Sequence, residues 1–262
     1  MTGRPSRRRG LPLRLAGIAL SLGALIGLWH LAFVLAGARP YLLPSPWQTA
    51  QALIGRWPTI LPHAGTTALE IVLGLGLGTL LGALSALTIA LSPLMRRMLL
   101  PLLVISQAIP VFAIAPLLVL WLGYGLASKV AMATLVIYFP VTTAFLDGLR
   151  RTEPGWLDLA RTMGASPLST LLRIRLPAAL PALASGLRVA TAVAPIGAVV
   201  GEWVGSSAGL GYLMLHANAR MQIDLMFAAL FVLTVFSLGL YALVDRTLRA
   251  ALPWQRETLD GD

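Results

Sequence analysis

The clearest structural signal in the chain is the run of residues 223–244, IDLMFAALFVLTVFSLGLYALV, whose one charged side chain is Asp224 near its start. An α-helix needs about 20 apolar residues to cross the hydrocarbon core of a bilayer. Five further apolar runs precede it, at residues 15–38, 64–91, 99–122, 128–146 and 183–200. The sequence therefore predicts an all-α polytopic membrane protein whose six transmembrane helices occupy residues 15–248.

The composition of the 262-residue chain excludes the other broad classes. Hydrophobic residues make up 57% of it and charged residues 11%, and the mean hydropathy is +0.81. A soluble domain carries about 25% charged residues, and a disordered chain is poor in hydrophobic ones. The chain has no cysteine, which excludes a disulfide-stapled fold, thiolate catalysis and cysteine-bound metals.

The basic residues are distributed unevenly about the predicted spans. Six spans place both termini on one side, and the segments on that side hold fifteen of the twenty basic residues, against four on the other. Cytoplasmic segments carry such an excess of arginine and lysine. We therefore expect a cytoplasmic basic N-terminus (residues 1–14) and a cytoplasmic tail (residues 249–262). The net charge of +10 then reflects topology, and no nucleic-acid partner is expected.

The first apolar run resembles a signal peptide only superficially. It covers residues 15–38, whereas the apolar region of a signal peptide has about 7–15 residues. We therefore expect a retained first span. On its outer side, Ser45 and Pro46 suit the cap and first turn of a short helix in the membrane interface. The apolar residues at helical spacing in this helix are Trp47, Ala50, Ile54 and Trp57.

Glycines recur along one face of the second predicted span. Gly74, Gly78 and Gly82 are spaced four residues apart, with Gly76 between the first two. Glycine at this spacing allows another helix to approach closely in lipid. The pattern therefore predicts a helix-packing face rather than a substrate contact.

Polar and proline residues inside the spans are candidates for a pathway or gate. A helix broken by proline at membrane depth lines a cavity or is covered by protein, and an intramembrane carboxylate usually faces the protein interior. The candidates are Glu70, Ser106, Gln107, Pro110, Pro195 and Glu202. For Glu70, snorkelling to the outer interface or pairing with Arg56 is an open alternative.

The longest predicted cytoplasmic loop, residues 150–180, is polar and basic. It suits two short helices rather than a DNA-reading unit, because about thirty residues between two spans are too few to bury a core of their own. We expect a docking element instead. The predicted boundaries are Pro154 and Gly164 for the first helix, and Ser166 with Pro177 and Pro181 for the second.

Within this loop, Asp158-Leu159-Ala160 is separated by three residues from Gly164, which is separated by nine residues from Ile174-Arg175-Leu176-Pro177. The pattern resembles the cytoplasmic loop of the permease subunits of bacterial ATP-binding-cassette importers: Glu-Ala-Ala, three residues, Gly, nine residues, Ile-x-Leu-Pro. Asp158 replaces the glutamate of that motif with a shorter carboxylate side chain, and Leu159 replaces its first alanine with a larger residue. The resemblance implies an ATPase-coupling loop with functional residues Asp158, Ala160, Gly164, Ile174, Leu176 and Pro177.

The resemblance extends over nearly the whole chain, toward the branch with sulfonate, nitrate, riboflavin and pyrimidine-precursor importers. Residues 43–46, 121–125 and 201–205 are similar to corresponding stretches of that branch. Residues 106–110 and 213–222 are most similar to permeases for hydroxymethylpyrimidine-type thiamine precursors. The substrate implied is such a small organic nutrient, with alkanesulfonate or taurine, nitrate and riboflavin as alternatives.

The resemblance also implies partners and a location. Such a permease is a multi-pass protein of the bacterial inner membrane that pairs with a second copy, binds two ATPase subunits and receives substrate from a soluble binding protein. The chain has one lysine, Lys129, and no Gly-x-x-x-x-Gly-Lys-Ser/Thr phosphate loop, so it is not expected to be an enzyme. No cofactor is expected. No metal is expected either, since His30, His63 and His216 share no ligand spacing.

Two alternatives of other classes remain at this point. A secondary carrier or channel without an ATPase would need coupling charges or repeat symmetry at the midplane, and would not need the cytoplasmic loop. An intramembrane enzyme would need a convergent nucleophile and base, and no Ser-His or His-Asp pairing stands out.

Overall fold

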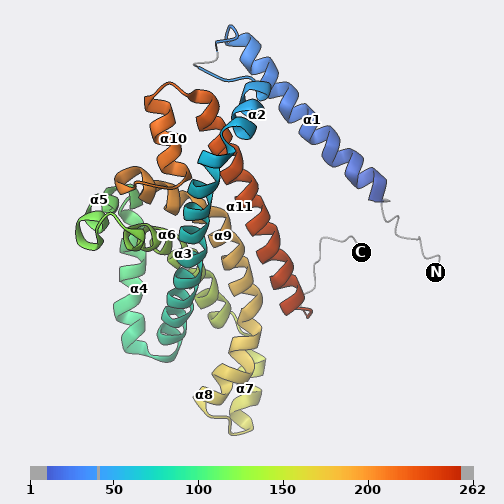
Figure 1. Cartoon of the computed structure of the whole chain (residues 1–262). Helices are drawn as coiled ribbons and strands as arrows, with labels where there is room; N and C mark the ends of the chain where they lie inside the picture. Colours follow the sequence, from blue (N-terminus) through green and yellow to red (C-terminus); the bar gives the residue numbers. More distant parts are fainter. Residues whose placement is uncertain (1–10, 40–41, 255–262) are drawn as a thin grey trace, which may run out of the picture.

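The computed structural model describes residues 11–39 and 42–254, and these residues form helices and connecting turns with no β-strand among them (Figure 1). The helices are α1 (Leu11–Leu35), α2 (Pro46–Gly55), α3 (Trp57–Leu91), α4 (Pro93–Ala108), α5 (Val111–Leu122), α6 (Leu126–Arg150), α7 (Pro154–Thr162), α8 (Pro167–Thr170), the π-helical turn η1 (Leu171–Arg175), α9 (Leu176–Gly205), α10 (Leu210–Ala219) and α11 (Ile223–Ala251). The predicted all-α class is confirmed.

Four described helices are long and apolar enough to cross a membrane: α3, α6, the continuous helix Pro167–Gly205, and α11. A fifth candidate is the pair α4 and α5, which is bent by 105°. The predicted first span coincides with α1, within which Gly23–Leu35 counts as a shorter apolar helix. The structure thus supports four to five spans, and the count of six stays a prediction.

Helix α6 lies between α3 and α9, and the contacts on both sides depend on glycine. A Cβ atom on Gly74 would come within 2.5 Å of the Ala133 Cβ of α6, and one on Gly78 within 2.6 Å of Ile137. On the other side, a Cβ on Gly197 of α9 would lie 2.7 Å from the Ala133 backbone. The predicted packing face of the second span is confirmed, because its glycines bring two backbones together.

The short helix after the first span begins as predicted. Ser45 accepts a hydrogen bond from the Gln48 N–H, and the Gln48 side chain accepts one from the Ser45 N–H, which completes a capping box. The predicted extent is wrong at its other end. The helix stops at Gly55, and Trp57 begins α3.

The predicted end of the second loop helix is also wrong. Pro177 and Pro181 do not bound it, because α8, η1 and α9 form one helix over Pro167–Gly205. The helix widens into a π-helical turn just before Pro177, where the Leu176 N–H donates to the Leu171 carbonyl five residues earlier. A proline removes one backbone donor, and this π-helical turn lets the helix continue through it.

The three prolines of the third predicted span have different effects on its helices. Pro101 and Pro116 lie inside α4 and α5, whereas Pro110 lies at the 105° bend between them. Figure 1 shows the resulting arrangement: α10 and α2 lie at one end of the bundle, and α7 and α8 project from the opposite end. We call these the α10 end and the α7 end.

Helix packing gives a direct test of the role of glycine. Gly78→Ile would force the new side chain into Ile137, whereas Gly76→Ile, two residues earlier, would place it in open space. We expect the first variant to lower the midpoint of thermal unfolding in detergent by about 5 °C or more, because overpacking a tight contact costs about 1–3 kcal/mol. Gly76→Ile should unfold like the unmodified chain. Equal midpoints for the two variants would contradict this packing.

Candidate functional site

The predicted docking loop, residues 150–180, is an ordered element at the α7 end, which we call the coupling segment. Helix α7 begins at Pro154 and ends at Thr162. The Ala165 N–H donates to the Ala160 carbonyl over 2.9 Å, and the Gly164 N–H donates to the Arg161 carbonyl over 3.0 Å. These two bonds form a Schellman motif, with Gly164 in the left-handed conformation at φ +71°.

A second cap follows the Gly164 turn directly. Ser166 accepts a hydrogen bond from the Ser169 N–H over 3.2 Å, and Pro167 occupies the first helical position. The predicted starts of both helices and the turn between them are therefore confirmed. Because caps and turn are satisfied locally, the coupling segment holds a defined helix–turn–helix shape outside the bundle.

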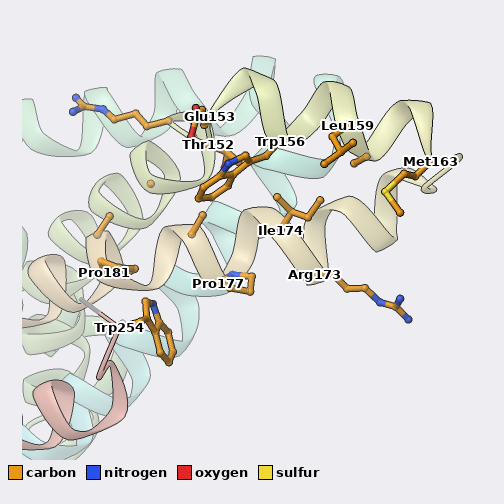
Figure 2. Close-up of a pocket in the computed structure, with 15 residues that line it drawn as sticks. Thr152, Glu153, Trp156, Leu159, Met163, Arg173, Ile174, Pro177, Pro181 and Trp254 are labelled. Carbon is orange, nitrogen blue, oxygen red and sulfur yellow. The ribbon is translucent and has the colours of Figure 1, made fainter. Parts of the chain in front are cut away.

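An apolar cavity of about 900 Å³ lies along the coupling segment. Figure 2 shows Trp156 and Leu159 of α7 pointing toward Ile174 on the facing helix, while the Arg173 side chain points away. Pro177 and Trp254 also line this cavity. Met163, at the far end of α7, is 78% exposed. Large apolar side chains thus form an accessible groove at the α7 end, which is the kind of surface that binds another protein.

The motif residues fall into two groups. Some are buried and hold the coupling segment against the bundle, and others line its exposed groove. Ala160 is buried, and Leu176 packs with Phe145 and Leu149 of α6 in a core cluster. Ile174 and Pro177 line the groove. Asp158 is exposed and forms an ion pair with Arg161 at 2.9 Å. Both residues belong to α7, so this pair does not hold the coupling segment to the bundle. The segment is therefore fastened to α6 on one side and open on the other.

At the α10 end, the structure brings Glu70 and Glu202 together inside the helix bundle. Both are 1% exposed, so the snorkelling alternative for Glu70 is wrong. Glu202 accepts a hydrogen bond from the Thr67 hydroxyl over 2.6 Å. Lys129 is buried beside the two carboxyl groups, and its ammonium donates to the carbonyls of Tyr124 and Gly125, the latter over 2.9 Å.

The remaining pathway candidates do not form one group. Ser106 is exposed near the end of α4, and its hydroxyl donates to the Leu103 carbonyl over 2.7 Å. Pro110 is exposed at the bend before α5, whereas Pro195 is buried inside α9. The side chain of Gln107 lies outside the described residues. The predicted set is thus split between an exposed bend and a buried cluster.

Sequence reasoning missed two parts of this arrangement. The buried Thr67 carries no signal in an apolar helix, because its neighbours in sequence do not reveal what it contacts. Trp254 belongs to the predicted tail, yet it lines the groove of the coupling segment. Both contacts join residues far apart in the chain, so only the three-dimensional arrangement reveals them.

Residues 78–256 match the family described as binding-protein-dependent transport system inner membrane component. The chain is 58% identical over 90% of its length to a probable ABC transporter permease protein of Haemophilus influenzae, covering 96% of that protein. It is 37% identical over 89% of its length to the formylaminopyrimidine transport permease protein ThiX of Halalkalibacterium halodurans, covering 93% of it.

A solved structure gives the same fold at lower identity. The inward-facing MetNI methionine ABC transporter includes a chain that superposes with a TM-score of 0.64 at 18% identity, covering 75% of this chain and 97% of that one. The overall fold thus occurs in a known transporter. The chain belongs to the binding-protein-dependent transport system inner membrane component family and is a permease subunit, the non-catalytic membrane component of an ATP-binding-cassette transporter.

Proposed function

We propose that this permease carries a hydroxymethylpyrimidine-type thiamine precursor through the bacterial inner membrane. Two copies of the chain would enclose the path, a soluble binding protein would deliver substrate at the α10 end, and two ATPase subunits would bind at the α7 end in the cytoplasm. The observation that carries the coupling to an ATPase is the coupling segment, whose family motif builds an open apolar groove. A carrier without an ATPase would have no use for this element.

The coupling segment is suited to insertion into a cleft of an ATPase. Helix α7 exposes Trp156 and Leu159, and the exposed Met163 follows directly after its last residue. The Schellman turn at Gly164 fixes the direction of α7 relative to the next helix. That next helix continues without interruption into the membrane as far as Gly205. Closure of the ATPase dimer would therefore displace α7 together with this continuous helix and shift the bundle between outward- and inward-facing states.

The charge of the coupling segment supports the same orientation. It contains Arg150, Arg151, Arg161, Arg173 and Arg175, against the acidic Glu153 and Asp158. An excess of arginine next to membrane spans is typical of cytoplasmic segments. The α7 end would then face the cytoplasm, where ATP is available.

The substrate is proposed from similarity to a named relative. ThiX is a formylaminopyrimidine transport permease, and this chain matches it over most of both lengths. Ser106, with Gln107 next to it, would supply hydrogen-bonding groups at the α4–α5 bend. The buried Glu70, Pro195 and Glu202 would shape the helices behind the path.

Disturbing the Gly164 turn should uncouple transport from ATP hydrolysis. Gly164→Val places a β-branched residue at φ +71°, which strains the turn by about 1–2 kcal/mol or more. We expect substrate-stimulated ATP hydrolysis by the reconstituted transporter to fall about 5- to 30-fold, since α7 no longer holds its orientation. Gly239→Val in α11, where a Cβ meets open space, is the control and should hydrolyse ATP normally. Equal activity of both variants would count against the docking role.

Uptake into proteoliposomes tests the substrate. With the permease, its ATPase and its binding protein present, uptake of labelled hydroxymethylpyrimidine should require ATP and should be competed by unlabelled formylaminopyrimidine. Riboflavin and taurine should not compete. Uptake of riboflavin or taurine in place of the pyrimidine would refute the substrate assignment. Uptake that persists without ATP would refute the coupling to an ATPase.

A further inference from the structure

The first turn of α10 is capped by side chains from two other helices. A helix N-terminus leaves four backbone N–H groups without partners inside the helix, and a side chain just before the helix usually binds one of them. Here the residue before α10 is Gly209, which has no side chain. Its N–H donates to His63 Nδ1 of α3 over 3.0 Å, and the Leu210 N–H donates to the Thr67 hydroxyl over 2.7 Å.

Glu202 of α9 binds the next two amides. Its Oε2 accepts hydrogen bonds from the Gly211 N–H and, over 3.2 Å, from the Tyr212 N–H. Its Oε1 accepts the hydrogen bond of the Thr67 hydroxyl. We call His63, Thr67 and Glu202 the α10 cap. The backbone N–H groups of residues 209–212 thus all donate hydrogen bonds to side chains of α3 and α9.

The α10 cap leaves no space for a side chain at the two glycines next to the Glu202 carboxyl group. Gly209 has φ +113°, and a Cβ there would lie 2.2 Å from the Glu202 Cδ. A Cβ on Gly211 would lie 2.8 Å from Glu202 Oε2. Thr67 and Glu202 are 0% and 1% exposed. A buried carboxylate at a helix N-terminus is also favoured by the helix dipole, so this contact is strong as well as specific.

Glu202 lies on the helix that begins in the coupling segment. The continuous helix runs from Pro167, next to the Gly164 turn, to Gly205. Its two ends lie at opposite ends of the bundle, with α7 and α8 at one and α10 at the other (Figure 1). One continuous helix therefore joins the proposed ATPase-docking surface to the base of α10.

We propose that Glu202 is a positioning residue that fastens α10 to the end of α9, so that movement of the coupling segment reaches the α10 end of the protein. This inference rests on the proposed function, since the movement comes from the ATPase. Glu202 acts through the backbone of α10 and not through contact with substrate. Thr67 supports it by orienting the carboxylate and binding the neighbouring amide.

Amide hydrogen exchange of the purified permease tests the cap. In Glu202→Ala, exchange at the Gly211 and Tyr212 amides should accelerate about 10- to 100-fold, because these two amides lose their buried acceptor. Glu202→Gln keeps an acceptor oxygen and should exchange at an intermediate rate. Thr67→Val should also accelerate exchange at the α10 amides. Thr142→Val, which removes a buried hydroxyl bonded within α6, should not. Equal rates in Glu202→Ala and Thr142→Val would overturn the cap.

A reporter on α10 tests the transmission in the full transporter. The chain has no cysteine, so Asn218→Cys introduces a single thiol at an exposed position of α10. With Glu202 present, its rate of alkylation by a maleimide should change between the nucleotide-free and vanadate-trapped states. In Glu202→Ala this change should be lost, while ATPase binding and basal ATP hydrolysis persist. Glu202→Gln should restore part of it, which a merely destabilised protein would not show.

The outcomes separate the two proposals. A nucleotide-dependent change that persists in Glu202→Ala would overturn the role of Glu202 and leave the permease function intact. A chain that binds no ATPase would overturn both. Loss of the reporter response together with loss of ATPase binding would assign the defect to folding and would also overturn the specific role of Glu202.

Discussion

The structure depends on the close approach of α6 to α3 and α9. In a bilayer every backbone group is bonded within its own helix, and lipid gives little hydrophobic force to drive helices together. Association therefore depends on contact between closely fitting surfaces. Gly74 and Gly78 of α3 and Gly197 of α9 supply that fit, since a methyl group at any of them would overlap α6. The rest of the fold is arranged around this three-helix unit.

The two functional ends are held by that unit in different ways. At the α7 end, the coupling segment is fastened to α6 through apolar packing of Leu176, and its own shape comes from local caps and turns. At the α10 end, the structure relies on polar groups buried between helices, above all Glu202 and Thr67. Such groups are stable in the interior only when they are hydrogen-bonded, so the α10 end requires α3 and α9 in register.

The coupling segment shows why part of the site could be predicted from the sequence. Pro154, Gly164 and Ser166 act on their own neighbours, so their effects on helix starts and turns can be inferred without knowing the fold. Pro177 and Pro181 misled the prediction for the opposite reason. A proline ends a helix only if the chain has no way to absorb the lost hydrogen bond, and here the π-helical turn before Pro177 absorbs it. Residues distant in sequence hold that turn in place, with Leu171 packed against α6.

The sequence by itself determined the class of the protein, the approximate positions of its apolar helices, the glycine packing face and the coupling motif. Each of these depends on composition or on spacing within one segment. The tertiary structure decided where the intramembrane charges lie, which candidates meet, and that Glu202 caps another helix. The contacts between α3 and α9 join residues more than a hundred positions apart, such as Thr67 and Glu202. A hydrogen bond across that separation exists only once the helices have packed, which is why the sequence alone could not identify the partners of Glu70 and Glu202.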